Sequence, residues 1–264
     1  MMKRILAVGG DRRQTILAGL LRELGQVETL AVPDWPDTAA EGTYDLLILP
    51  CPTLDSKGKL RAGSLEAADL LPFCGPQTRV LGGGLTGRGN LPAPLDRAED
   101  LLAAPLVKAE NGRLTAEAFF ALPRAGKGLT GARCLLLGWG CIGRPLSFFL
   151  RGFGASVTVA ARRAEVRAEA AGLGLHAVPF SEVRGAFDFV CSTVPARTLT
   201  DAQLAALGPD CLWFELASAP GGLPASVPAG IRVVPAGGLP GKYLPRAAAE
   251  ALYAELVRIL EGAA

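Results

Sequence analysis

A glycine-rich turn between a strand-like run and a helix-like run limits the folds open to this chain more than any other feature. Residues Ala132–Leu150 contain an apolar strand pattern, the spacing G-x-G-x-x-G, and the first turns of a helix. In this pattern the first glycine permits a tight turn, the second lets the backbone approach a pyrophosphate, and the third lets the helix pack closely on the strand. The N-terminal end of the helix then offers free N–H groups to the phosphates. The predicted cofactor-binding residues of this turn are Gly138, Trp139, Gly140, Cys141, Ile142 and Gly143. The alternative is a glycine turn that only packs.

The end of the next predicted strand, Ala155–Ala160, indicates which dinucleotide is bound. An acidic residue is expected there if the ribose 2′-hydroxyl of NAD is recognised. The strand leads instead into Arg162 and Arg163, whose guanidinium groups can hold a 2′-phosphate through charge-assisted hydrogen bonds. The sequence therefore favours NADP, and the alternative is that both arginines are solvated loop charges. The predicted strand exit at Thr193, Val194 and Pro195 is a further candidate for cofactor contact.

Composition places the chain among ordinary globular proteins. Of its 264 residues half are hydrophobic and 20% are charged, and the net charge is +2. These values argue against a nucleic-acid-binding protein and against a disordered tail. No uncharged apolar run approaches the length of a membrane span. We expect Met1–Asp11 to contain a first β-strand rather than an export signal.

The cysteines and the histidine do not indicate a metal site. The six cysteines show no C-x-x-C spacing and are interpreted as small core residues. Cys141 could be modified, but a packing role is favoured. The one histidine, His176, falls at the start of a short predicted strand. We expect no bound metal.

Strands and helices alternate along most of the chain, which predicts parallel sheets with right-handed crossovers. The predicted fold is α/β, with two Rossmann-like domains, each a doubly wound, mainly parallel sheet, and a cleft between them. Residues 1–114 are expected to form an N-terminal substrate or catalytic domain and residues 115–244 the NADP-binding domain. The C-terminal helix 245–264 is expected to pack back on the first domain, with Leu252, Leu256 and Ile259 on one face.

Two segments near the predicted domain junction are assigned from local signals. Asp96 is expected to cap a helix that runs to Ala103. Asn111-Gly112 is expected to form a turn, followed by a helix from Ala116 to Leu122 that Thr115 caps.

Substrate-binding candidates come from loops that follow predicted strands, because ligands of open α/β sheets bind beyond the carboxyl ends of the strands. Several of these loops are basic, which suggests a small anionic substrate. Arg12 is preferred to Arg13, which is expected to face solvent. The candidates are Arg12, Arg13, Lys57, Arg88, Ser218 and Lys242; no catalytic residue is assigned.

Several motifs together resemble the family of the dipicolinate synthase A subunit, which is similar in architecture to the 2-hydroxyacid and alanine dehydrogenases. The matching segments are Gly9–Gln14, Thr115–Glu117, Leu137–Gly143, Ala161-Arg162, Ser192–Pro195, Leu216–Gly222 and Gly238–Gly241. The chain departs from the family at Arg246-Ala247-Ala248, where the family has Lys-Thr-Ala, so no role of that lysine or threonine is carried over.

The resemblance implies NADP-dependent oxidation of a cyclic dihydrodipicolinate-type precursor, the product of the tetrahydrodipicolinate synthase step, to dipicolinate (pyridine-2,6-dicarboxylate) during spore formation. It also implies the flavoprotein-like B subunit of dipicolinate synthase as partner and a location in the cytoplasm of the mother cell of a sporulating bacterium. Formation of an aromatic ring supplies much of the driving force, so the protein would mainly clamp a small dicarboxylate and orient it. Two alternatives stay open: an NADP-dependent dehydrogenase of another small carboxylate, and a regulatory subunit that binds a nucleotide. Assembly into a homo-oligomer is also left open.

Overall fold

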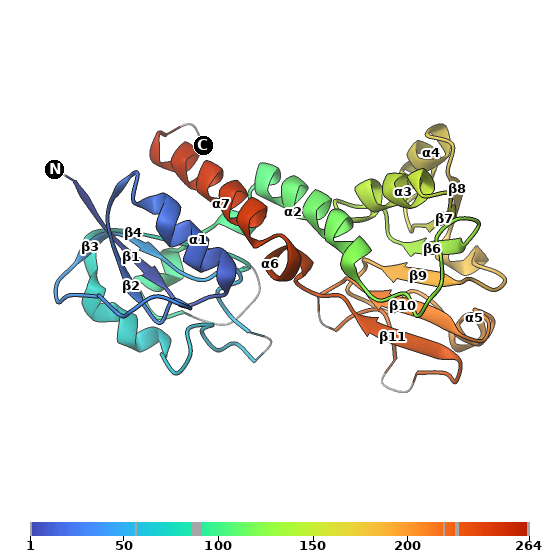
Figure 1. Ribbon diagram of the computed structural model, residues 1–264, viewed down its shortest axis with the longest axis horizontal. Helices are drawn as coiled ribbons and strands as arrows, with labels where there is room; N and C mark the ends of the chain where they lie inside the picture. The colour runs from blue at the N-terminus through green and yellow to red at the C-terminus, as the bar shows by residue number, and fades with distance from the viewer. Residues whose placement is uncertain (1, 56, 86–90, 219, 225–226, 263–264) are drawn as a thin grey trace. The chain divides into compact units, whose positions relative to one another are not determined.

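The protein divides into two compact units (Figure 1). The computed structural model describes residues 2–55, 57–85, 91–218, 220–224 and 227–262. Unit 1 consists of Met1–Glu110 and Pro240–Ala264, and unit 2 of Asn111–Leu239. The roles expected for residues 1–114 and 115–244, as a substrate domain and an NADP-binding domain, stay predictions.

The described part of unit 1 contains a five-stranded parallel sheet of order β2-β1-β3-β4-β5. Successive strands spread from β1 in both directions, which makes the sheet doubly wound. The strands are β1 (Lys3–Val8), β2 (Gly25–Leu30), β3 (Tyr44–Ile48), β4 (Cys74–Gly82) and β5 (Glu99–Asp100).

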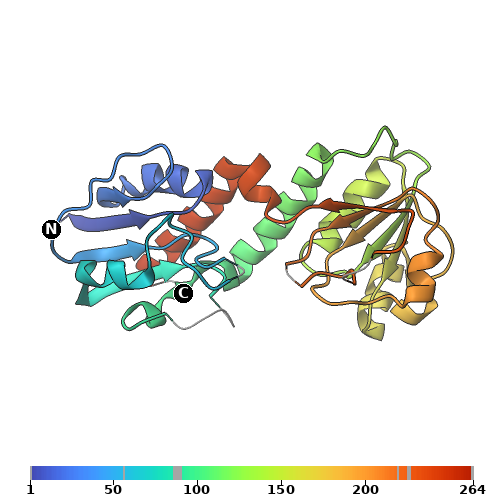
Figure 2. The same cartoon turned by 90° about the horizontal axis from the view of Figure 1, so that it is seen from below.

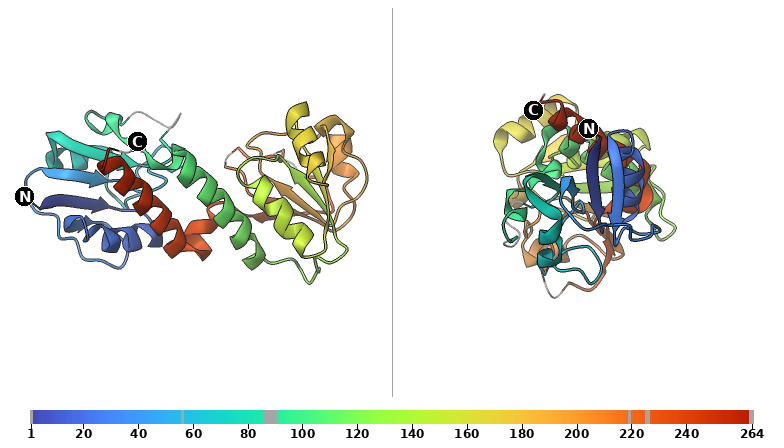
Figure 3. Two further views of the ribbon diagram at one scale, coloured as in Figure 1. Left: turned by 90° about the horizontal axis from the view of Figure 1, so that it is seen from above. Right: turned by 90° about the vertical axis from the view of Figure 1, so that its left-hand side faces the viewer.

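Helices α1 (Arg12–Leu21) and α7 (Pro245–Leu260) lie side by side over one face of this sheet (Figure 3). Leu252, Leu256 and Ile259 are buried there, as their helical spacing predicts. Because α7 is the last helix of the chain, the core of unit 1 joins residues from both ends of the sequence. Short 3-10 helices accompany β4 and β5: η1 (Ala67–Phe73), η2 (Leu95–Arg97) and η3 (Leu101–Ala103).

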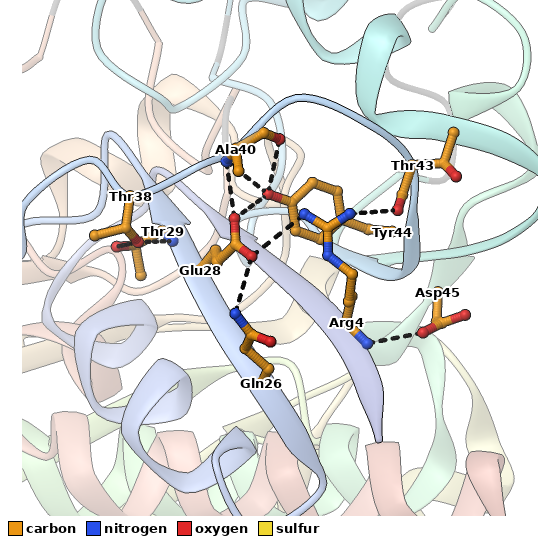
Figure 4. A network of polar contacts seen from close by, with 9 residues as sticks. All are labelled: Arg4, Gln26, Glu28, Thr29, Thr38, Ala40, Thr43, Tyr44 and Asp45. Atoms are coloured by element: carbon orange, nitrogen blue, oxygen red, sulfur yellow. Dashed lines mark hydrogen bonds and ion pairs between the residues drawn. The ribbon is translucent and has the colours of Figure 1, made fainter. Parts of the chain in front are cut away.

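A buried carboxylate organises the edge strand β2 (Figure 4). Glu28 accepts hydrogen bonds from the Tyr44 hydroxyl, the Ala40 N–H at 2.8 Å and Arg4 at 3.3 Å. Burial alone would raise the pKa of Glu28, but these three donors outweigh it and hold the pKa below its ordinary value. The edge is thus tied to β1, to β3 and to the segment that follows β2.

The described part of unit 2 contains a six-stranded parallel sheet of order β11-β10-β9-β6-β7-β8. This is the strand order of the Rossmann fold, and its connections change direction between β6 and β9. The predicted fold class of two doubly wound α/β sheets is therefore confirmed. The strands are β6 (Arg133–Leu137), β7 (Ser156–Ala160), β8 (His176–Val178), β9 (Phe189–Ser192), β10 (Cys211–Glu215) and β11 (Ile231–Pro235).

Helices cover both faces of this sheet (Figure 2). Helix α3 packs on the face that carries Leu136, and Leu204 of α5 joins the core on the face that carries Leu135. None of the helices in the described ranges is both long and apolar enough to cross a membrane. The helices of unit 2 and of its junctions with unit 1 are α2 (Pro105–Ala118), η4 (Phe119–Ala121), α3 (Gly143–Gly152), α4 (Ala164–Gly172), η5 (Phe180–Glu182), α5 (Asp201–Ala205) and α6 (Leu239–Tyr243).

Both assignments near the predicted domain junction are wrong. Helix α2 continues through Asn111-Gly112, and Thr115 lies inside it, where its hydroxyl donates to the Asn111 carbonyl at 2.7 Å instead of capping a helix. The predicted helix after Asp96 is replaced by η2, β5 and η3. Asp100 ends β5, and its carboxylate accepts from the N–H groups of the next turn, which stops the strand there.

Candidate dinucleotide-binding site

The turn after β6 has the conformation that its glycines predict. Gly138 adopts a φ of +90°, and a Cβ at this position would lie 2.6 Å from Thr193 Oγ1. At Gly143 a Cβ would lie 2.4 Å from the Gly138 carbonyl oxygen. Both positions exclude a side chain, the first because of its backbone conformation and the second because helix and turn are in close contact.

Gly140 differs from the other two glycines because a Cβ there would meet no described atom within 4 Å. The residue is exposed and lines a pocket of about 580 Å³, within the range of roughly 300–1,000 Å³ that is typical of ligand sites. Open space above a backbone that carries no side chain suits the approach of a pyrophosphate. The lining residues are Gly138–Ile142, Ala161–Arg163, Val166, Phe180 and Thr193–Thr198.

The pocket brings together almost all of the predicted cofactor residues. Trp139, Cys141, Ile142, Arg162, Arg163, Thr193, Val194 and Pro195 line it with Gly138 and Gly140, whereas Gly143 lies beneath the turn. The residues therefore come from the loops after β6, β7 and β9, at one edge of the sheet.

Trp139 gives the turn a rigid base. Its side chain is buried, and its indole N–H donates to Ser147 Oγ at 3.2 Å. The Arg144 guanidinium lies over the indole ring, 4.5 Å from its centre, and also pairs with Glu169 of α4. These contacts join the turn to both α3 and α4.

The loop after β7 is held by an arginine that the sequence analysis missed. Arg167 of α4 donates to the carbonyl oxygens of Ala161 at 2.9 Å and Arg162 at 2.7 Å. Arg162 and Arg163 are exposed beside the pocket. The Arg163 Nε lies 3.5 Å from Glu165, but in the described part of the chain no acidic residue pairs with Arg162. Arg162 and Arg163 therefore line this end of the pocket, and Arg167 holds the loop that carries them.

Other lining residues were also missed. Val166 and Phe180 add apolar surface, and Arg197 adds a cation whose guanidinium bonds to Asp201 Oδ1 at 2.6 Å. The hydroxyl of Thr198 is buried without a described partner. No residue spacing marks these positions, because they reach the pocket from segments that only the folded sheet brings together.

Helix α2 supports the turn from outside the pocket. A Cβ on Gly112 would lie 2.1 Å from the Cys141 carbonyl oxygen, so the backbones of helix and turn are in direct contact. Gly112, which the sequence predicts to be part of a turn, is needed for this contact because it has no side chain. The Cys141 side chain is exposed, so the packing role favoured for it is wrong: its backbone packs, and its thiol does not.

The other cysteines are mostly core residues, as expected. Cys51, Cys134, Cys191 and Cys211 are buried and Cys74 is half-buried. Burial raises the pKa of Cys51, Cys134 and Cys211 to about 12, which makes these thiols poor nucleophiles. No group of three or more potential ligand side chains for a metal occurs in the described residues.

In unit 1 the arginine that was expected to face solvent, Arg13, is buried. Arg13 is only 7% exposed and forms a bidentate pair with Asp11, whereas Arg12 is exposed. The cause is local, since Asp11 is the N-cap of α1 and also accepts the Arg13 N–H at 3.0 Å. A Cβ on Gly241 would lie 2.7 Å from Arg13 Nε, so the chain also covers this pair. The expectation that Arg13 faces solvent is wrong.

The remaining substrate candidates that the structure describes are on the surface. Lys57 and Lys242 of unit 1 and Ser218 of unit 2 are exposed, and Arg88 lies outside the described residues. His176 is exposed at the start of β8, 3.4 Å from Thr158 Oγ1. It does not line the pocket.

The fold of unit 2 and the position of its pocket are those of a Rossmann-type dinucleotide-binding domain. Residues 106–207 match the family model of the D-isomer specific 2-hydroxyacid dehydrogenase, NAD binding domain. The match indicates a nicotinamide cofactor and a dehydrogenase-type role.

Among individual proteins, the chain is similar to the A subunit of dipicolinate synthase from Bacillus subtilis (strain 168). The identity is 30% over 135 residues, which are 49% of this chain and 46% of that protein, so the match spans less than half of the relative. The crystal structure of the Bacillus subtilis protein has a TM-score of 0.78 at 21% identity and covers 99% of this chain and 97% of that one. The crystal structure of its counterpart from Bacillus halodurans has a TM-score of 0.80 at 22% identity, with coverage of 98% and 97%. A transhydrogenase from Sinorhizobium meliloti has a TM-score of 0.62 at 14% identity, with coverage of 98% and 93%. The resemblance that the motifs indicate is confirmed.

Proposed function

We propose that the protein is an NADP-dependent dehydrogenase that oxidises a cyclic dihydrodipicolinate-type dicarboxylate to dipicolinate, as the A subunit of dipicolinate synthase. The observation that supports this most is the pocket of unit 2, where the open Gly140 and the cations Arg162 and Arg163 line one space. The similarity to the dipicolinate synthase A subunit supports the choice of substrate and of the B subunit as partner.

NADP is preferred to NAD because the loop after β7 offers cations where NAD requires an acid. Each good charge-assisted hydrogen bond to the 2′-phosphate would contribute about 1.5–3 kcal/mol, which is roughly one to two decades in affinity. Arg162 is the principal ligand in this proposal because Arg163 is shared with Glu165.

The reaction suits a site without a histidine base. Loss of one hydride and one proton makes the substrate ring aromatic, so binding and orientation are the main requirements. Oxidation of a 2-hydroxy acid would need a base for the hydroxyl proton, normally histidine, and His176 lies away from the pocket.

The cofactor assignment is tested by calorimetry. NADP should bind more tightly than NAD, and Arg162→Asp should erase the difference because it removes a phosphate ligand and adds repulsion. Arg232→Asp is a control, since Arg232 is exposed on β11 and does not line the pocket. Equal affinities in the unmodified protein would contradict the assignment.

Exposed cations are proposed to clamp the substrate carboxylates. Since Asp11 engages Arg13, the best candidates in the described part of unit 1 are Arg12, Lys57 and Lys242. Arg12→Ala should cost about 2–4 kcal/mol in kcat/KM for the dicarboxylate and leave the NADP affinity unchanged. If Arg12→Ala and the corresponding Arg13 variant both leave turnover unaltered, the loop after β1 is structural.

A second candidate function is dehydrogenation of another small carboxylate, which the 2-hydroxyacid dehydrogenase family match favours. Turnover with NADP and freshly generated dihydrodipicolinate precursor, compared with a series of 2-hydroxy acids, separates the two. NADP binding without turnover unless the B subunit is added would indicate a regulatory role for this chain.

A further inference from the structure

An acid and a hydroxyl meet at the ends of two neighbouring strands of unit 2. Glu215 ends β10 and is in register with Ser192, the last residue of β9. Glu215 Oε2 accepts the Trp213 indole N–H at 3.0 Å and the Gly222 N–H at 2.9 Å. Glu215 Oε1 and Ser192 Oγ are both buried without a partner among the described residues.

The chain after β10 folds directly over this pair. We call residues 216–218 and 220–222 the β10 loop. Its first two N–H groups, those of Leu216 and Ala217, donate to the Ser192 carbonyl at 2.9 and 3.1 Å. At its other end a Cβ on Gly222 would lie 2.6 Å from Ser192 Oγ, so only glycine lets the loop come this close.

The Glu215 carboxylate closes the β10 loop. Besides its bond to Gly222, it lies beneath Gly221, where a Cβ would be 3.2 Å from Glu215 Cδ. Gly221 has a φ of +80° and donates its N–H to the Ser218 carbonyl at 3.0 Å. The exposed Ser218 therefore lies in a turn whose other end, at Gly221 and Gly222, is fixed by the Glu215 carboxylate.

The order of the strands places this loop beyond the reactive end of the cofactor pocket. Arg162 and Arg163, the proposed ligands of the 2′-phosphate, follow β7, and the pocket continues through the loops after β6 and β9. A dinucleotide that bound along this edge, with its phosphorylated ribose at the arginines after β7, would extend toward the loops after β9 and β10. We compared the described residues at the ends of β6, β9 and β10 and in the loops that follow these strands. Among them, Glu215 is the only residue with a carboxylate side chain.

We propose that Glu215 is a positioning residue for the substrate: its carboxylate fixes the β10 loop, and with it Ser218, beside the nicotinamide end of the pocket. This inference rests on the proposed function for the identity of the substrate. The role requires a hydrogen-bond acceptor and does not require a negative charge, because the two groups bonded to Glu215 are neutral N–H donors.

The experiment compares Glu215→Ala with Glu215→Gln. Glu215→Ala should raise KM for the dicarboxylate about tenfold, the equivalent of one lost hydrogen bond, and leave the NADP dissociation constant within about twofold. Glu215→Gln keeps an acceptor oxygen for Gly222 and should restore KM to near the original value. Arg232→Asp is the control, because Arg232 is exposed on the neighbouring strand β11.

Hydrogen exchange gives a readout that does not depend on turnover. Amides of the β10 loop should exchange faster in Glu215→Ala and at the original rate in Glu215→Gln and Arg232→Asp, while amides of the turn after β6 stay unchanged. Unaltered loop exchange in Glu215→Ala would overturn the proposal, and so would equal impairment of the Ala and Gln variants, which would indicate a role for the charge. If the unmodified protein does not oxidise the dicarboxylate, the proposed function fails, and the exchange data still test the role of Glu215.

Discussion

The three glycines of the turn after β6 differ in what surrounds them, and this difference separates binding from folding. Gly140 has open space above it, whereas at Gly143 a Cβ would meet the Gly138 carbonyl oxygen. A side chain at the first position intrudes on a ligand, and one at the second intrudes on the protein itself.

We therefore expect Gly140→Val to abolish NADP binding while unfolding stays cooperative at a nearly unchanged temperature. Gly143→Val should instead lower the unfolding temperature, because the close contact between helix and turn costs about 1–3 kcal/mol to relieve. Calorimetric titration and thermal denaturation check both variants. Unchanged NADP affinity in Gly140→Val would remove the turn from the binding site.

At the scale of elements, helix α2 shows how a local signal can mislead. Asn-Gly is a strong turn signal, yet here Gly112 lies inside α2, and position 112 requires glycine because any side chain would collide with the turn that carries Cys141. The requirement comes from a partner almost 30 residues away in the sequence, which no local pattern records. By contrast, the strands and the turn after β6 follow from apolar runs and glycine spacing, which are local.

The same limit applies to the pocket. The residues of the glycine turn and of the loop after β7 could be predicted because each loop has its own motif. Arg167, Phe180 and Thr198 could not, since they contribute through contacts that exist only in the folded sheet.

Glycines inside helices make the contact of α2 with the turn testable. Gly112→Ala should destabilise the protein by about 1–3 kcal/mol and weaken NADP binding, because it pushes α2 away from the turn. Gly19→Ala in α1 is the matched control: a Cβ there meets nothing within 4 Å, so the change should stabilise by about 0.5–1 kcal/mol. Chemical denaturation and NADP titration of both variants provide the comparison. A Gly112→Ala protein that is as stable as Gly19→Ala would contradict the contact.

At the scale of the whole molecule, the carboxyl groups with lowered pKa values belong to unit 1. They are Asp11, Glu28, Asp55 and Glu255. For Asp11, burial would raise the pKa, but the hydrogen bonds and charge of Arg13 outweigh it. A depressed folded-state pKa stabilises the protein above the ordinary values of 3.8 and 4.5, and this stability is lost as the pH falls through the folded-state values.

Acid should therefore loosen unit 1. As the pH falls below about 4.5, amides of β1, β2 and α1 should begin to lose protection, measured against the intrinsic exchange rate at each pH. The double variant with Asp11→Asn and Glu28→Gln should lower the free energy of unfolding at neutral pH and make it depend less on acid. Pulsed hydrogen exchange measured by mass spectrometry resolves the segments. Loss of protection first in β6 and β9 would contradict the prediction.

The position of α7 also affects the order in which the chain can mature during synthesis. The whole of unit 2 leaves the ribosome before α7, and α7 completes the core that contains Ile5 and Leu17. Until α7 is made, the apolar face of the unit 1 sheet that α7 covers stays partly exposed, and such surfaces bind chaperones or aggregate. Unit 2 can therefore complete its fold during synthesis while unit 1, most of which precedes it in the sequence, still lacks the helix that completes its core.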